Sequence, residues 1–224
     1  MTAPRYDSER LAADFVGYLK AVQAHAGHEA HAFRLARALE LRVRVGLFNR
    51  AYPEALPDPV VVVQPWWYGG NNDILRHEIA HVMLYWSGLE SHIVGEFGPE
   101  AGWRVIENLC QQAVAFLHLP QPLVDEAVRR HGVSAQAVRH LQRVGNAPAP
   151  TALRRLMYDD PAAERAGFLT SGHYIAEVAQ CNLALPFRWL DRVPEPAQKF
   201  GDGARLTLAR LPGRGGTVGV CVGL

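Results

Sequence analysis

The sequence predicts an α+β protein, and three patterns support that class. Apolar residues recur at steps of three and four near the start of the chain, which predicts an amphipathic helix over Ser8–Ala26. The short β-branched run Val60–Val63 is typical of a buried strand. Near the end of the chain, apolar residues alternate with other residues at 206–208 and 218–222, which predicts further strands.

The elements between these patterns follow in chain order. Ala30–Leu41 is predicted to form a second helix. Apolar and polar residues alternate over Arg42–Leu47, which is typical of a half-buried strand. Asn49–Pro59 contains three prolines and is expected to form turns. Asp73 is a plausible N-cap for a helix that runs through Met83.

The second half of the chain is predicted to be helical at first. A loop is expected over Gly95–Gly102, and a long helix over Trp103–Leu119, where Pro120 stops it. Three short helices are expected after that, over Val124–Arg130, Ser134–Val144 and Thr151–Met157.

Composition indicates an ordinary globular protein and excludes several classes. The 224 residues are 49% hydrophobic and 20% charged, which is enough for a substantial core and argues against disorder. The net charge of +1 identifies no partner. The three cysteines lack C-x-x-C spacing, the first ten residues do not resemble a signal peptide, and no run of about 18 apolar residues occurs. We therefore expect a cytoplasmic protein with reduced thiols and no membrane association.

One short motif carries the chemistry. His77 and His81, in the sequence HEIAH, are four residues apart and so project from one helix face. Two imidazoles in that arrangement can ligate one Zn²⁺ ion. Glu78 lies between them and is placed to act as general base toward a metal-activated water. The motif is specific for zinc peptidases of the zincin type.

A catalytic zinc site needs a third protein ligand and an open position for water. The downstream candidates are Glu90, His92, Glu96, Glu100 and Glu107. Spacing favours Glu107, because it lies on the next predicted helix, where packing holds a carboxylate rigidly; Glu100 is the next choice. The longer H-E-x-x-H-x-x-G-x-x-H motif is absent from the sequence, which disfavours a metzincin.

The stretch after the motif resembles a known family. Glu107 is followed three residues later by the small residue Cys110, then by an apolar run, and thirteen residues after the glutamate by Pro120. Together with HEIAH, this pattern is similar to the ImmA/IrrE-type zinc metallopeptidases, and the resemblance covers roughly residues 10 to 155.

The resemblance implies an organisation and a function. It implies a zincin-like metallopeptidase domain over 1–123, a helix-turn-helix-like helical segment over 124–157, and leaves a small C-terminal β-containing region over 158–224. It also implies that Glu107 completes the zinc site with His77 and His81. The expected activity is that of a zinc-dependent endopeptidase. Its expected substrate is a helix-turn-helix transcriptional repressor, cleaved to induce stress-response or mobile-element genes.

A second polar group usually steadies the developing oxyanion in such sites. The sequence does not rank the candidates, which are Tyr85, His118, His140, His173 and Tyr174. No feature of the sequence indicates an oligomeric state.

A basic segment leaves a second interpretation open. Residues 127–158 contain six arginines and no acidic residue, and Arg139 and Arg143 are candidates for recognition. The segment can be a solvated face, a docking surface for the substrate protein or, less favoured, a nucleic-acid contact. The alternative function is accordingly a non-proteolytic regulator that binds a repressor or DNA through this segment.

Overall fold

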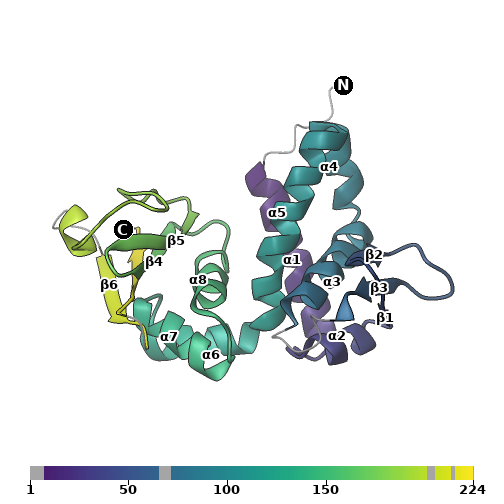
Figure 1. Cartoon of the computed structure of the whole chain (residues 1–224), viewed down its shortest axis with the longest axis horizontal. Helices are drawn as coiled ribbons and strands as arrows, with labels where there is room; N and C mark the ends of the chain where they lie inside the picture. Colours follow the sequence, from purple (N-terminus) through teal and green to yellow (C-terminus); the bar gives the residue numbers. More distant parts are fainter. Residues whose placement is uncertain (1–7, 66–71, 201–204, 213–214, 224) are drawn as a thin grey trace. The chain divides into compact units, whose positions relative to one another are not determined.

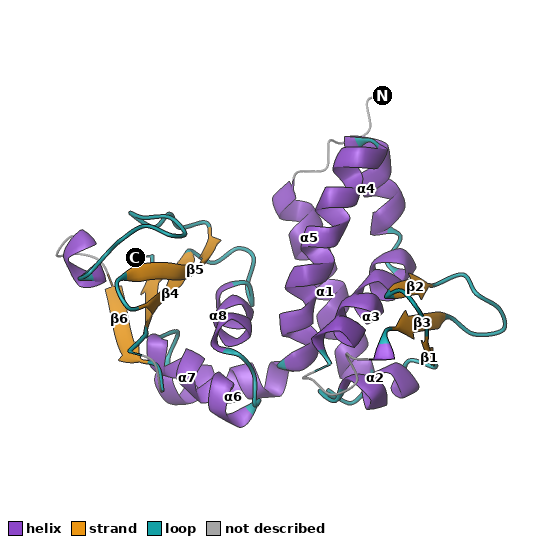
Figure 2. Ribbon diagram, in the orientation of Figure 1, coloured by secondary structure: helices purple, strands orange, loops and turns teal. Residues whose placement is uncertain are grey.

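The computed structural model describes residues 8–65, 72–200, 205–212 and 215–223 (Figure 1). The chain divides into two compact units, Met1–Pro120 and Gln121–Leu224, and each is described by itself. Both units combine helices with a β-sheet, so the predicted α+β class is confirmed (Figure 2). No helix in the described ranges is long and apolar enough to cross a membrane, and the three cysteines are free thiols.

The first unit is built around long amphipathic helices. Its helices in the described ranges are α1 (Ser8–His25), α2 (Ala32–Ala38), α3 (Asp73–Trp86), α4 (Leu89–Phe97) and α5 (Pro99–His118). The spacing that predicted α1 buries Leu11, Phe15 and Leu19 in the core. Near the end of α1, Gln23 Nε2 donates a hydrogen bond to the carbonyl of Leu117 on α5 at 3.3 Å. This contact fixes α1 against α5.

The sheet of the first unit has three strands, β1 (Arg42–Val45), β2 (Arg50–Tyr52) and β3 (Val60–Val63), in the order β1-β3-β2. In the central strand, Val61 pairs with Val43 of the parallel strand β1 and with Ala51 of the antiparallel strand β2. Three of the four residues of β3 are buried, as the β-branched run predicted. Strand β2 was not predicted, because it lies in the turn-rich segment 49–59 and depends on pairing with β3.

The loop predicted over Gly95–Gly102 is wrong. Helix α4 continues to Phe97, Gly98 breaks the chain with a φ of 76°, and α5 begins at once with Pro99. Proline suits the first turn of a helix because its missing N–H would have no partner there. A Cβ atom on Gly102 would lie 3.2 Å from the carbonyl oxygen of Ile93. This glycine therefore allows α4 and α5 to approach closely and does not mark a loop.

The second unit begins with three short helices at the predicted positions, α6 (Gln121–His131), α7 (Ala135–Val144) and α8 (Ala149–Met157). Ser134 caps α7, since its Oγ accepts a hydrogen bond from the backbone N–H of Ala137 at 3.3 Å. A four-stranded antiparallel sheet follows in the order β5-β4-β7-β6. Its strands are β4 (Arg165–Ser171), β5 (Tyr174–Cys181), β6 (Arg205–Arg210) and β7 (Thr217–Val222), and the 3₁₀-helix η2 (Pro196–Lys199) lies between β5 and β6.

The helices and the sheet of the second unit pack together. At the start of α7, the backbone N–H of Ala135 donates to Thr207 Oγ1 on β6 at 2.9 Å. On β4, a Cβ atom added to Gly167 would lie 2.5 Å from Leu153 Cδ1 of α8. The sheet thus buries one face against these helices, as layered domains do.

A buried arginine joins the helices of the second unit. The side chain of Arg155 on α8 is 1% exposed. It donates to Asp159 Oδ1 at 2.6 Å and to Gln121 Oε1, at the start of α6, at 2.8 Å. Burial lowers the pKa of Arg155, and the charge of Asp159 opposes that change. The cation is therefore retained in the interior by its two partners.

Replacing this arginine tests its structural role. Arg155→Ala is expected to destabilise the protein by about 3–5 kcal/mol, because it leaves a carboxylate without its buried partner. Urea unfolding followed by circular dichroism measures the change. Arg129→Ala, on the exposed side of α6, is the matched control and should change stability by less than about 0.5 kcal/mol. Equal effects of both substitutions would contradict the assigned role.

Candidate metal centre

Helix α3 carries the His77–His81 motif and begins one residue before the sequence analysis placed it. The N-cap is Asn72, with a φ of 61°, and Asp73 is the first helical residue instead of the cap. The Asp73 carboxylate accepts a hydrogen bond from Arg76 Nη1 at 2.8 Å. An acidic residue in the first turn also interacts favourably with the helix dipole. These contacts fix the start of the helix one turn before the histidines.

The two histidines occupy a partly buried strip of α3. The opposite side of the helix packs in the core through Leu75, Ile79, Val82 and Met83. The side chains of His77 and His81 are 19% and 16% exposed, respectively. Because their four-residue spacing places them one turn apart, both rings project from the same side. Partial exposure leaves them accessible to a ligand while packing restricts their motion.

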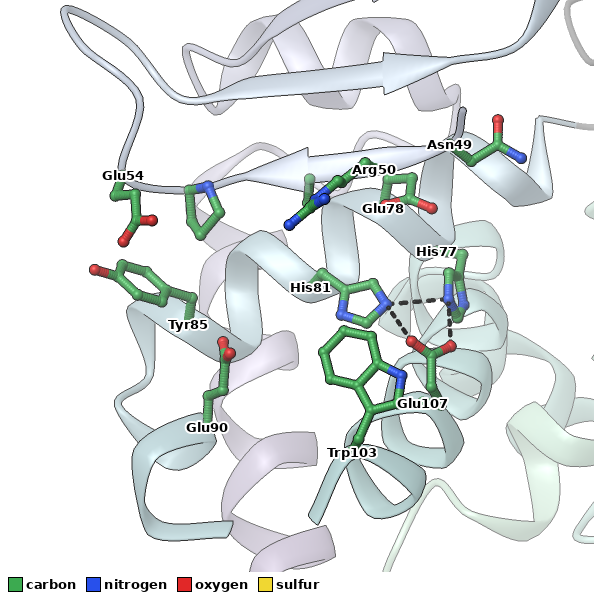
Figure 3. Close-up of a pocket in the computed structure, with 12 residues that line it drawn as sticks. Asn49, Arg50, Glu54, His77, Glu78, His81, Tyr85, Glu90, Trp103 and Glu107 are labelled. Carbon is green, nitrogen blue, oxygen red and sulfur yellow. Dashed lines mark hydrogen bonds and ion pairs between the residues drawn. The ribbon is translucent and has the colours of Figure 1, made fainter. Parts of the chain in front are cut away.

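Glu107 on α5 meets both histidines (Figure 3). Its Oε2 lies 3.2 Å from His77 Nε2, and its Oε1 lies 3.3 Å from His81 Nε2. The two Nε2 atoms are themselves 3.1 Å apart. Helices α3 and α5 pack against each other, which brings together donors that are far apart in the sequence. In the described part of the chain, this is the one group of three such side chains whose ligand atoms converge.

The chemistry and spacing of these donors fit a zinc ion. Imidazole nitrogen and carboxylate oxygen are both common zinc ligands. Donors about 2.0–2.1 Å from a tetrahedral zinc ion are about 3.3 Å from one another. The two Nε2 atoms, 3.1 Å apart, lie close to that separation, and each has a different carboxylate oxygen of Glu107 at 3.2 or 3.3 Å. Three protein donors also leave one tetrahedral position for water or substrate.

The protonation states of the site favour binding of a cation. Burial, and then the neighbouring His77, lower the pKa of His81 to about 4, although Glu107 opposes the change. The imidazole of His81 is therefore neutral at pH 7 and offers a lone pair. Burial and the charge of Glu107 raise the pKa of Glu78 to about 7, against a backbone hydrogen bond from Ala51. A cation among these groups would stabilise the ionised carboxylates.

Glu78 borders the cavity that contains the three donors. The cavity has a volume of about 640 Å³, within the range of small-ligand and substrate sites. Glu78 is 7% exposed and lies beneath β2, whose Ala51 is its hydrogen-bond partner. His77, His81 and Glu107 line the same cavity, so the donors and the Glu78 carboxylate border one space.

Trp103 and Arg50 are among the cavity residues that the sequence did not indicate. The indole of Trp103 stacks on the His81 ring, with the ring centroids 5.8 Å apart and the planes 17° apart. The side chain of Arg50 on β2 extends into the cavity (Figure 3). Its guanidinium carbon lies 5.3 Å from the centre of the Tyr52 ring. The alternation of β2 is the only sequence signal for Arg50, and the three prolines that follow the strand obscure that signal.

The other candidates for the third ligand do not join the group. Glu90 lines the cavity, and burial, followed by the charge of Glu54, raises its pKa. Glu100 is 87% exposed and pairs with Arg104 at 2.9 Å. His92 and Glu96 lie on the exposed side of α4.

The candidates for oxyanion stabilisation and recognition are distributed over both units. Tyr85 lines the cavity, whereas His118 is buried with its Nδ1 3.3 Å from Asp73 Oδ1. His140, His173 and Tyr174 belong to the second unit, as do Arg139 and Arg143 on α7. Within the first unit, the structure therefore leaves Tyr85 as the predicted candidate that borders the donors.

Comparison with known proteins reveals distant relatives. The chain is 33% identical over 88 residues to the radiation response metalloprotease IrrE of Deinococcus radiodurans, covering 39% of this chain and 27% of that protein. It is 34% identical over 83 residues to the protein of the same name from Deinococcus deserti, covering 37% and 30%. The matches thus span less than a third of the length of these relatives. No protein-family model matches the chain.

A solved structure shares the fold. A transcriptional regulator from Mycobacterium tuberculosis superposes with a TM-score of 0.55, over 93% of this chain and 75% of that one. The sequences are 13% identical, so the likeness concerns the arrangement of the chain alone.

Metal analysis tests the site. The purified protein is expected to bind one zinc ion per chain, and His77→Ala, His81→Ala and Glu107→Ala should each abolish stoichiometric binding, because two donors hold the ion weakly. Elemental analysis after dialysis measures the content. His92→Ala is the matched control and should retain zinc, since His92 lies outside the converging group. Unchanged zinc in the two motif variants would rule out the site.

Proposed function

We propose that this protein is a zinc-dependent endopeptidase of the ImmA/IrrE type with a zincin-like first unit. The observation that supports this most strongly is the convergence of His77, His81 and Glu107 in one cavity with Glu78. The distant relationship to radiation response metalloproteases points the same way.

His77, His81 and Glu107 would hold the zinc ion. The ion supplies Lewis acidity, which polarises a carbonyl group and lowers the pKa of water. The stacking of Trp103 limits rotation of the His81 ring and covers one side of it. Packing of α3 against α5 keeps Glu107 beside the two rings, so the donors are arranged before the ion binds.

Glu78 performs the proton transfers of peptide hydrolysis. Its carboxylate accepts a proton from the attacking water as the oxygen bonds to the peptide carbon. The same group then donates that proton to the amine as the carbon–nitrogen bond breaks. The hydrogen bond from Ala51 orients the carboxylate, and Arg50 and Tyr85 are the cavity groups available to steady the negative oxygen.

Strand β2 offers an edge with which the substrate backbone can pair. It is an edge strand, because it pairs with β3 on one side only, and Arg50 and Ala51 line the cavity. An extended peptide can pair with such an edge through its backbone. The substrate segment is therefore a flexible or locally unfolded stretch of chain.

The proposed substrate is a helix-turn-helix transcriptional repressor in the cytoplasm, cleaved to induce stress-response or mobile-element genes. The name of the distant relatives supports the link to a stress response. A regulatory peptidase of this kind is selective, and low activity on generic substrates agrees with the proposal.

A non-proteolytic regulator is the second candidate function. Arg139 and Arg143 lie one turn apart on α7, and neither forms an ion pair in the described ranges. These free cations favour docking of an acidic protein surface or DNA. The candidate differs from the peptidase in one respect that can be measured, since it requires no catalytic role for Glu78.

Substitution of the general base separates the two functions. Glu78→Gln should retain zinc, because Glu78 is outside the converging group, but should lower the cleavage rate by about 10²–10⁴. Gln has nearly the same shape, so packing is preserved. The assay is incubation with a repressor encoded beside this gene, followed by gel and intact-mass analysis.

The control is Glu96→Gln, an isosteric change at an exposed position outside the cavity, and it should cleave as the unchanged protein does. Equal cleavage by the Glu78→Gln protein would refute the assigned mechanism. Absence of cleavage by every form, with equal regulation of the target gene in cells, would establish the non-proteolytic regulator instead.

A further inference from the structure

A second cavity lies entirely within the second unit. It has a volume of about 500 Å³ and is formed along one side of α7. Arg139 and His140 are adjacent, and each lies three or four residues from both Gln136 and Arg143, so the four residues share a helix face. The end of α6 and Pro212, two residues after β6, close the sides. The cavity is therefore a separate feature from the metal centre.

The lining of this cavity is basic. Its charged residues are Arg139 and Arg143, and none of its lining residues is acidic. Among the residues that the structure describes, the ion pairs of the basic segment involve Arg130, Arg154 and Arg155, and neither Arg139 nor Arg143 takes part in one. The nearby Arg130, by contrast, pairs with Glu126 at 2.5 Å. Two uncompensated guanidinium groups on one concave face create a positive potential that attracts anions.

A buried histidine provides independent support for a ligand. His140 lines the cavity and is 5% exposed. Its Nε2 atom is buried without a hydrogen-bond partner in the described ranges. The ring of His131, which also lines the cavity, lies 5.2 Å away at an angle of 54°. A buried polar atom without a partner is costly, and such atoms are rare unless a ligand or ordered water satisfies them.

We infer that this cavity binds a small phosphorylated molecule through its phosphoryl group. Guanidinium groups bind phosphate oxygens through paired, charge-assisted hydrogen bonds, and imidazole N–H groups add further donors. The volume is typical of a small-molecule site. A concave pocket with its histidine buried suits a compact anion better than the convex backbone of a duplex. The inference is independent of the peptidase function, because no residue of the metal centre contributes to it.

Calorimetric titration of the full chain with pyrophosphate tests the inference, at about 0.15 M salt so that weak surface binding is screened. Saturable binding is expected. Arg139→Gln and Arg143→Gln should each weaken it by about 10- to 100-fold, the range expected for loss of a charge-assisted hydrogen bond. His140→Phe, which keeps an aromatic ring and removes the nitrogens, should also weaken binding.

Arg129→Gln is the control, since Arg129 is exposed and does not line the cavity. It should bind pyrophosphate as the unchanged protein does, and every variant should retain its circular dichroism spectrum and zinc content. Lack of saturable binding, or unchanged affinity in the Arg139→Gln/Arg143→Gln double variant, would overturn the inference. Binding of a short DNA duplex without binding of pyrophosphate would also overturn it and assign these arginines to a nucleic-acid backbone.

Discussion

The packing of α5 against α3 determines whether this chain has a metal centre. One turn of α3 supplies two imidazoles, but a third donor has to come from another element. Ile106 and Cys110 are buried in the core and hold α5 in one rotation about its axis. That rotation places Glu107 beside the two rings. The apolar contacts between the helices, more than any polar contact in the site, therefore set the geometry of the donors.

The same packing places two acidic side chains close together in a partly buried site, and a bound cation would offset their repulsion. Burial raises the pKa of Glu78, and the charge of the neighbouring Glu107 raises it further. Burial also raises the pKa of Cys110, and Glu107, Glu78 and Glu90 raise it further. Cys110 thus stays a protonated, apolar packing residue, and it is absent from the converging group. The converging group therefore has three donors, the number that catalytic zinc sites use, whereas closed structural sites use four.

The parts of the site that depend on local sequence were predictable, and the parts that depend on tertiary contacts were not. The helical spacing of His77 and His81 follows from the sequence, because it concerns a single turn. Glu107 was one of five candidates for the third ligand, and sequence spacing could only favour it over the other four. The packing of the helices is what brings it to the histidines. Gly102 suggested a loop, because sequence alone does not distinguish a turn from a close helix contact.

Strand β2 illustrates the same limit for the cavity wall. Three residues followed by a proline-rich turn give only a weak strand signal, and pairing with β3 decides their conformation. Arg50 and Ala51 enter the cavity only as a consequence of that pairing. The residues that surround the donors were therefore hidden from an analysis of local pattern, although the donors themselves were not.

The basic segment leads to a more general point about charge runs. Its lack of acidic residues suggested a broad positive face, but acidic partners come from outside the run. Three of its six arginines are paired, Arg130 with Glu126, Arg154 with Glu177 and Arg155 with Asp159. Folding thus pairs half of these arginines with acidic residues. Two of the unpaired ones, Arg139 and Arg143, line the cavity beside the buried His140. A linear count of charge predicts a surface, whereas the folded arrangement places two of the three unpaired arginines in one pocket, and a pocket favours a compact anion.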